Sequence, residues 1–169
     1  MRKPGSVLLL MFLTVVAGTS NAQLNLPEGW RAPKAQELAL TDNTWRNSSR
    51  ENYLVVRADF DGDGKEDQAQ LLVNADGTTY GLFILLGSGA AVVLDSKDVN
   101  SLTTMGIDKL PPGTHKTACG KGYGNCKAGE PESVRLRNPG ILYFQTEGAK
   151  SVFFWSVSDR TFRRLWLSD

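Results

Sequence analysis

Short runs of apolar or alternating residues, separated by Gly, Asn, Asp and Ser, fill the chain from Tyr53 onwards. Alternation with a period of two is typical of strands that bury one face, and the separating residues are typical of turns. The pattern predicts strands over residues 53–58, 68–73, 80–86, 90–94, 103–107, 134–137, 141–146, 152–156 and 161–167. This succession predicts an all-β fold with minor α content, built as an antiparallel β-sheet or a β-sandwich.

The start of the chain has a different pattern. Arg2 and Lys3 precede an apolar run over residues 7–16, and small residues follow up to Ala22. This order is typical of a cleaved secretion signal, and the apolar run is too short to span a bilayer. No Cys lies near the cleavage point, so no lipid anchor is expected. We therefore expect residues 1–22 to be removed and the protein to be periplasmic or secreted, with no membrane anchor.

Residues 23–50 are expected to form an arm and residues 51–169 a single β domain, because a chain of this length suffices for one core. Pro33, followed by good helix formers, predicts a short helix in the arm, and Trp45 is expected to pack the arm onto the domain. Loss of the signal leaves 17 Lys and Arg against 18 Asp and Glu. A nearly neutral chain gives no reason to expect nucleic acid as the partner.

The most distinctive chemistry lies in residues 59–67, where four Asp are interspersed with Gly. Ca²⁺ takes about six to eight oxygen ligands, and a tight loop can direct the side chains of its first, third, fifth and ninth residues, with the carbonyl of its seventh, at one point. Gly64 is the sixth residue, where such a loop must turn sharply. The expected ligands are the side chains of Asp59, Asp61, Asp63 and Asp67 and the backbone carbonyl of Lys65.

Two other interpretations of this run are less consistent with it. Asp and Gly are ordinary residues of solvated hairpin turns, but a turn needs only one or two of them. An EF-hand needs a bidentate Glu at its twelfth position, where this chain has Gln70, and it needs flanking helices. The flanks here have the composition of strands, so a calcium loop between two strands is expected.

Residues 53–73, a strand followed by D-x-D-G-D-G-x-x-D and a second strand, resemble the calcium loop of FG-GAP and VCBS-type β repeats, first known from integrin α chains. The resemblance implies that the four Asp side chains bind Ca²⁺. It covers a single copy of the motif, whereas a β-propeller needs several repeats. A full propeller is therefore not expected.

Cys119 and Cys126 are the two cysteines of a chain that is expected to be exported, and an oxidising compartment favours a disulfide between them. A zinc site would need two more soft ligands, but the chain has one His. A redox pair would be expected at the spacing Cys-x-x-Cys, which the chain lacks.

Residues 113–132 are rich in Gly, Lys and Pro and lack periodicity, which predicts a long loop. The disulfide would close part of it into a ring that displays Lys121 and Tyr123 outwards. A surface loop that the disulfide merely staples has the same pattern.

The last strand places Phe162, Arg164 and Trp166 on one face. Aromatic residues in such a hairpin usually face the core or each other. An Arg that lies over Trp on an exposed face would instead suit a protein partner. Lys121, Tyr123 and Arg164 are therefore the candidate partner-binding residues.

No catalytic constellation is present in the sequence, because His115 is isolated and none of the common hydrolase or nucleotide-binding motifs occurs. We therefore expect a protein that is not an enzyme. Its overall plan loosely resembles small periplasmic immunity proteins and lysozyme-type inhibitors, although the Ser-Gly-x-x-Tyr motif of some inhibitors is absent. The resemblance implies a protein partner in the cell envelope, such as a toxic cell-wall-directed effector. The alternative is a calcium-stabilised structural or glycan-binding envelope protein with no inhibitory role.

Overall fold

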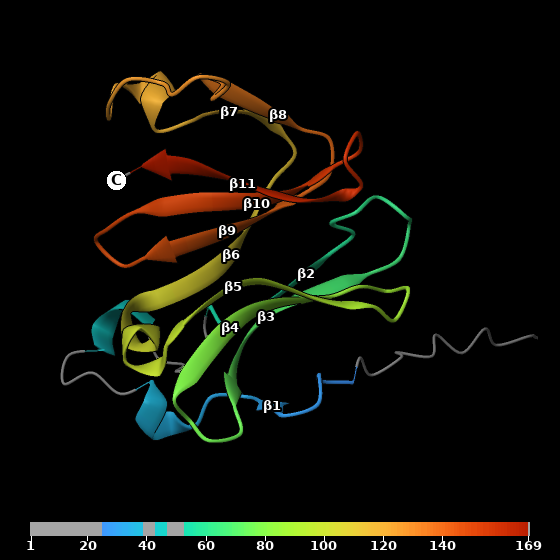
Figure 1. Ribbon diagram of the computed structural model, residues 1–169, viewed down its shortest axis with the longest axis vertical. Coiled ribbons are helices and arrows are strands. Elements are labelled where there is room, and N and C mark those ends of the chain that lie inside the picture. The colour runs from blue at the N-terminus through green and yellow to red at the C-terminus, as the bar shows by residue number, and fades with distance from the viewer. Residues whose placement is uncertain (1–24, 39–42, 47–52, 169) are drawn as a thin grey trace, which may run out of the picture.

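The computed structural model describes residues 25–38, 43–46 and 53–168, and the expected signal over residues 1–22 lies outside these ranges. Sheet A contains β1 (Trp30–Arg31), β2 (Val55–Ala58), β3 (Asp67–Asn74), β4 (Thr79–Leu85) and β5 (Ala91–Asp98). Sheet B contains β6 (Met105–Leu110), β9 (Gly140–Gln145), β10 (Lys150–Ser156) and β11 (Thr161–Ser168). Sheet C consists of β7 (Gly113–Lys116) and β8 (Ser133–Leu136). The strands of each sheet pair antiparallel (Figure 1).

The main core lies between sheets A and B. Alternate residues of β3, namely Ala69, Leu71 and Val73, point into it, as a strand with one face on the core requires. Sheet B supplies the opposite side of the core through Met105, Ile107, Ile141, Tyr143 and Phe153. The hydroxyls of Tyr80 and Tyr143 form a 2.6 Å hydrogen bond across the core. This bond gives each buried hydroxyl a partner and joins the two sheets.

The two sheets are also tied together at their edges. At one edge, the Ile107 N–H of β6 donates to the Tyr53 carbonyl, which precedes β2, at 2.8 Å. At the other edge, Arg164 of β11 forms an ion pair with Asp95 of β5 at 3.3 Å. Sheet C covers the outer face of sheet B, where Val134 and Leu136 pack in a second core with Val152 and Leu167.

The N-terminal arm is attached to sheet A. β1 pairs with the end of β3, and the Trp30 ring packs edge-on against Phe83 with 4.6 Å between centroids. Trp45 stacks on Tyr53 at 5.8 Å, which confirms that Trp45 packs the arm onto the domain. The described part of the arm contains two 3₁₀ turns, Ala35–Glu37 and Asn43–Arg46. The helix expected after Pro33 is therefore a single 3₁₀ turn in the residues described.

The prediction of an antiparallel β protein is confirmed, and three details differ from it. Residues 103 and 104 were predicted to begin a strand, but they end the 3₁₀ helix Val99–Thr104, and β6 begins at Met105. β1 was not predicted, because two residues carry no periodic pattern. Residues 113–132 were predicted to be a loop throughout, but Gly113–Lys116 forms β7 and Cys119–Lys121 forms a 3₁₀ turn. β7 lacks a strand pattern of its own and is held by its pairing with β8, which propensity within the segment cannot reveal.

Candidate functional site

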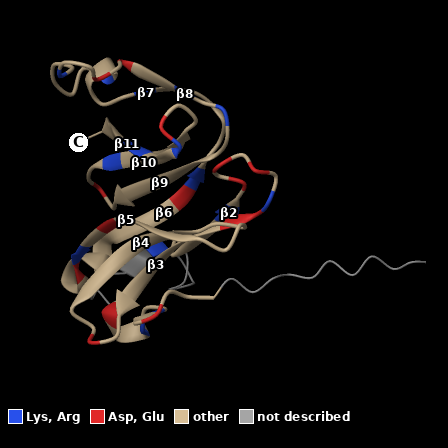
Figure 2. Ribbon diagram, turned by 45° about the vertical axis from the view of Figure 1, so that its right-hand side comes forward, with Lys and Arg blue, Asp and Glu red and all other residues tan. Residues whose placement is uncertain are grey.

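The acidic loop, residues 59–66 with Asp67 at the start of β3, joins β2 to β3 as predicted (Figure 2). Phe60 is fully buried in the main core and anchors the loop from within. Gly62 and Gly64 have φ angles of 82° and 84°, a left-handed conformation that glycine adopts without strain. The glycines among the Asp residues therefore allow the backbone to make this tight turn.

Three of the four expected Asp side chains come together in this loop. Asp59, Asp61 and Asp67 each offer a carboxylate oxygen within 4.8 Å of the others. Asp63 lies outside this group, and its Oδ1 accepts the Lys65 N–H at 2.8 Å. The geometry therefore brings together a subset of the expected ligands.

Backbone N–H groups of the loop point at the clustered carboxylates. Asp59 accepts from Gly62 and Gly64 at 2.7 and 2.9 Å, and Asp61 Oδ1 accepts from the Asp63 N–H at 3.0 Å. These bonds fix the side chains in place and offset part of the repulsion between neighbouring negative charges.

Asp67 is the most constrained member of the cluster because it is fully buried. Its Oδ2 accepts the N–H groups of Phe60 at 2.8 Å and Asp61 at 3.3 Å, and its Oδ1 accepts the Gly87 N–H at 2.8 Å. Burial raises the pKa of the Asp67 carboxyl above its ordinary value, and the N–H donors of Gly87 and Phe60 oppose the rise. Asp67 therefore joins the acidic loop to the turn between β4 and β5.

The acidic loop makes close contact with two other turns. A side chain at Gly87 would lie 2.6 Å from the Lys65 Cβ and 2.9 Å from the Glu66 carbonyl oxygen, so only glycine fits there. A side chain at Gly62 would collide with the Asn138 amide in the turn between β8 and β9. The loop is thus packed into the domain on both sides.

The carboxylate oxygens of the cluster are suitable ligands for a hard cation. A carboxylate has about four lone-pair directions, and the N–H donors occupy three of these at Asp67, two at Asp59 and one at Asp61. About six remain on the three groups, and oxygen is the ligand that Ca²⁺ and Mg²⁺ prefer. The cluster could therefore hold a metal ion.

The predicted disulfide between Cys119 and Cys126 is confirmed, with 4.9 Å between the two Cα atoms. The ring that it closes is attached to the end of sheet B. The Ala118 N–H donates to the Trp166 carbonyl of β11 at 2.8 Å, and the Tyr123 N–H donates to the Ala118 carbonyl at 3.0 Å. The ring is therefore held against β11 at its base while its tip is exposed.

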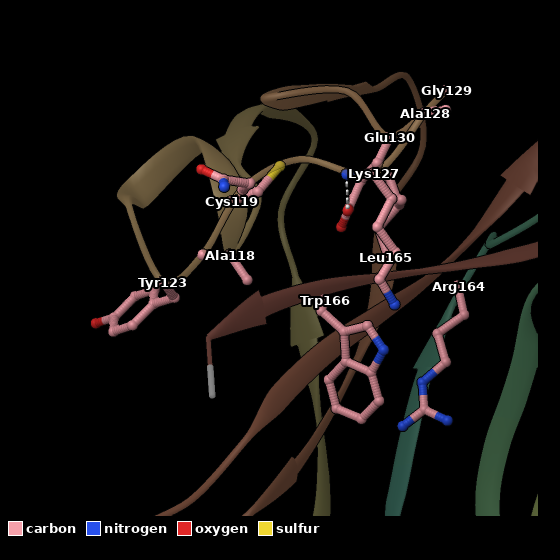
Figure 3. Close-up of a pocket in the computed structure, with 12 residues that line it drawn as sticks. Ala118, Cys119, Tyr123, Lys127, Ala128, Gly129, Glu130, Arg164, Leu165 and Trp166 are labelled. Carbon is pink, nitrogen blue, oxygen red and sulfur yellow. Dashed lines mark hydrogen bonds between the residues drawn. The ribbon is translucent and has the colours of Figure 1, made fainter.

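A surface pocket of about 440 Å³ lies between this ring and β11 (Figure 3). Its floor consists of Arg164, Leu165 and Trp166, and the opposite wall includes Tyr123 and Lys127. Figure 3 shows the Lys127 side chain extending from the loop towards Trp166, whereas the Tyr123 ring points away from the pocket. The pocket thus combines aromatic and cationic groups.

The three expected partner-binding residues have different surroundings. Tyr123 is 55% exposed and lines the pocket rim, as predicted for a displayed ring residue. Lys121 does not line the pocket, and its Nζ donates to the Leu167 carbonyl at 2.8 Å. Lys121 therefore helps to fix the ring onto β11, although the rest of its side chain is exposed.

Arg164 lies over the Trp166 ring, with 4.2 Å from the guanidinium carbon to the ring centroid. Arg164 is also partly buried. Its guanidinium pairs with Asp95, and its Nε donates to Ser151 Oγ at 3.0 Å. Arg164 therefore has a structural role between the sheets besides lining the pocket. Trp166, 41% exposed, presents more free apolar surface.

The sequence did not single out Lys127 or Glu130, which also line the pocket. The Glu130 N–H donates to the Lys127 carbonyl, and Glu130 Oε2 accepts the Lys127 N–H at 3.1 Å. The Ala-Gly pair between these residues is an ordinary turn signal. It could have predicted this turn, but not its position over β11.

A second pocket, of about 320 Å³, lies on the outer face of sheet B beside the arm. Its lining residues are Trp45, Tyr53, Asp108, Leu142, Phe144, Thr146 and Lys150. Phe144 packs edge-on against both Trp45 and Tyr53, with centroids 6.0 and 5.5 Å away. Tyr53 has a φ of 64°, an unusual conformation for an aromatic residue, so its place in this cluster is fixed at some cost in backbone strain.

Among the described residues, no helix is both long enough and apolar enough to span a bilayer. Comparison with known protein families, with curated proteins and with solved structures found no match to this chain.

Proposed function

We propose that this is an exported, non-catalytic binding protein that holds Ca²⁺ in the acidic loop and recognises a protein partner in the cell envelope. The partner-binding surface, here named the ring–β11 surface, consists of Tyr123, Lys127, Arg164 and Trp166. The single observation that supports it best is the pocket between the disulfide ring and β11, with exposed Tyr and Trp beside cationic groups. An immunity protein or an inhibitor of a toxic cell-wall-directed effector is the function most consistent with these features.

The composition of the ring–β11 surface supports a protein partner. Tyr, Trp and Arg are enriched among the residues that contribute most to protein–protein binding. The surface is also held in place by the Cys119–Cys126 disulfide and by the hydrogen bond from Ala118 to Trp166. Little conformational entropy is then lost when a partner binds.

The acidic loop supports a stabilising role for Ca²⁺ and not a catalytic one. Asp67 is fully buried, and the N–H groups of the loop already occupy part of each clustered carboxylate. A Ca²⁺ ion bound there would be held by carboxylate oxygens of the cluster, and its two positive charges would offset two of the three negative charges. Its expected effect is on the stability of the turns around the loop.

The test is capture of a partner from envelope extract by the immobilised mature protein. Tyr123→Ala and Trp166→Ala should each weaken capture about fivefold or more, because each removes exposed aromatic contact area. Val93→Ala is the matched control, because Val93 is a similarly exposed apolar residue on β5 that does not line the pocket. Capture that survives loss of Tyr123, Lys121 and Arg164 together, but is lost in a folded Asp63→Ala variant, would place the binding surface at the acidic loop.

A second candidate function is a glycan-binding or structural envelope protein, and the pocket beside the arm favours it. Aromatic rings next to Asp108, Thr146 and Lys150 offer apolar surface and hydrogen-bonding groups to a sugar. Retention on peptidoglycan, lost in Trp45→Ala and unaffected by Tyr123→Ala, would support this alternative. Capture of a single protein with no retention on peptidoglycan supports the first proposal.

A further inference from the structure

The backbone of β11 has an open edge next to the ring–β11 surface. β11 is the terminal strand of sheet B and pairs with β10 alone within that sheet. Its register is regular from Thr161, opposite Ser156, to Trp166, opposite Ser151. In an antiparallel pair, the N–H and C=O groups of successive residues point alternately towards the partner strand and away from it.

The direction of this alternation follows from one hydrogen bond. The Trp166 carbonyl accepts the Ala118 N–H, so it points away from β10. Arg164 and Phe162, two and four residues earlier, must then direct their N–H and C=O groups to the same open side. Within the described part of the chain, no further backbone hydrogen bond reaches these two residues from that side.

We propose that an extended, acidic segment of the partner protein pairs with the open edge of β11 at Phe162 and Arg164, and adds a strand to sheet B beside the pocket. This inference rests on the proposed function, because it assigns the mode by which the partner is bound. Strand addition supplies affinity through main-chain hydrogen bonds and specificity through pockets for alternate side chains. Here the pocket between the ring and β11 would take one such side chain.

Two features favour β11 over β5, the terminal strand of sheet A that lies next to it. The chain itself already begins a strand addition at β11, since Ala118 donates to Trp166. A pocket adjoins the open groups of β11, and none of the residues that line it belongs to β5.

The charge of the surroundings indicates an acidic segment. The ion pairs Arg164–Asp95 and Arg163–Asp159 balance each other in charge. The remaining charged side chains of the ring, the pocket and the turn before β11 are the cations Lys121, Lys127 and Arg160 and the acid Glu130. Acidic side chains at alternate positions of the added strand would thus meet a positive surface.

The test uses the purified mature protein and an acetylated, amidated hexapeptide of alternating valine and glutamate. At millimolar peptide, amide hydrogen exchange of Phe162 and Arg164 should slow at least about tenfold, while that of β5 residue Val93 should not change. The same peptide with every amide N-methylated keeps its carbonyl acceptors but loses its own donors, and its methyl groups block close approach to β11, so it should protect much less. A valine and lysine peptide should protect less, because its charges are repelled.

A matched pair of variants tests the backbone group itself. Arg164→Ala and Arg164→Pro both remove the guanidinium, but only the proline removes the N–H, which points away from β10. Proline is tolerated on an edge strand in that orientation. Loss of the guanidinium affects both variants equally, so the test is their difference: peptide-induced protection of Phe162 should be at least about fivefold weaker in the proline variant than in the alanine variant.

Three results would overturn the inference: no protection by the acidic peptide, equal protection by the N-methylated peptide, or protection that rises with protein concentration in the absence of peptide, which would indicate pairing of two copies. Because these measurements need no partner, they remain separate from the proposed function. Partner capture that needs Tyr123 but survives Arg164→Pro would leave the proposed function standing and remove strand addition. Loss of the proposed function alone would leave the peptide result intact.

Discussion

The acidic loop and the disulfide ring are both short, tightly closed segments, but their side chains point in opposite directions. In the acidic loop, Phe60 and Asp67 are fully buried, and the clustered carboxylates accept N–H groups of the loop itself. In the ring, the residues from Lys121 to Cys126 are exposed, and its attachment to β11 relies on backbone groups and the Lys121 ammonium.

The difference teaches that a closed loop can serve either stability or recognition, depending on where its polar groups find partners. The acidic loop uses the Asp67 carboxylate to bind the turn between β4 and β5, and Gly62 packs against Asn138 in the turn between β8 and β9. The ring satisfies its backbone within itself and against β11, which leaves the Tyr123 ring free to contact another molecule. Changes in the two segments should therefore affect different properties of the protein.

The largest expected effect is that of Asp67→Ala on stability. This change leaves the N–H groups of Phe60, Asp61 and Gly87 without their acceptor, the first in buried and the other two in part-buried surroundings. Since an unsatisfied buried donor costs about 1–3 kcal/mol, the free energy of unfolding should fall by roughly 3 kcal/mol or more. Urea unfolding in chelator measures it, with Asp63→Ala as the exposed control that should change by about 0.5 kcal/mol or less. Equal losses in the two variants would contradict the distinct role of Asp67.

Calcium should stabilise the protein through the same loop. A ligand that binds only the folded state adds about 2.7 kcal/mol when its free concentration is about a hundred times Kd. Chelation of calcium-loaded protein should therefore lower the melting temperature by several degrees, and Asp61→Ala should remove the response. An identical melting curve in metal-free and calcium-saturated protein would exclude a calcium site in the acidic loop.

Loss of the disulfide should lower the free energy of unfolding less than Asp67→Ala does. Its larger effect should be on partner binding. In the chain-entropy model, a ring of this size contributes about 2 kcal/mol or slightly more to stability. Cys119→Ser with Cys126→Ser should lower the free energy of unfolding by about that amount, and should weaken partner capture because the ring becomes less ordered. Thiol labelling of the wild-type protein without reductant is the control and should find no reactive thiol. Unchanged capture by the double variant would separate the ring from recognition.

An acid titration of stability must separate the acidic loop from a salt bridge in the arm. Glu37 accepts from Arg31 Nη2 at 2.6 Å, and this hydrogen bond lowers the pKa of Glu37 from 4.5 to about 2. Because the pKa is lower in the folded state, the stabilisation is complete above pH 4.5 and is lost as the pH falls towards 2. Glu37→Gln should reduce stability at pH 7 by about 1 kcal/mol for a pair near the surface, and should remove this part of the pH dependence. Urea unfolding at several pH values checks it, and parallel curves for wild type and variant would contradict it.

The smallest expected effect on stability is that of Tyr123→Ala. The side chain is more than half exposed, so its removal should change the free energy of unfolding by about 0.5 kcal/mol or less. The same variant should weaken partner capture. Tyr123→Ala thus affects binding and not stability, whereas Asp67→Ala is expected to affect stability. A large loss of stability in Tyr123→Ala would show that the ring is part of the fold and not a separate recognition element.

Local patterns in the sequence determined much of this protein. The period-two runs predicted most strands of sheets A and B, because a strand with one face on a core must alternate. The spacing of Asp59, Asp61 and Gly64 predicted the tight loop between β2 and β3, since the side chains and the glycine conformation that make it are all within nine residues. The disulfide followed from two cysteines in a chain expected to be exported.

Only the tertiary structure decided how distant segments use these parts. Asp67, unlike Asp63, binds a distant segment, because its Oδ1 accepts the Gly87 N–H from the turn between β4 and β5. The Lys121 ammonium donates to the Leu167 carbonyl, 46 residues along the chain. The buried Arg46 guanidinium donates to the carbonyls of Leu102 and Met105. The physical reason is that loop conformation depends on neighbouring residues, whereas burial and hydrogen-bond partners depend on which strands the fold brings together.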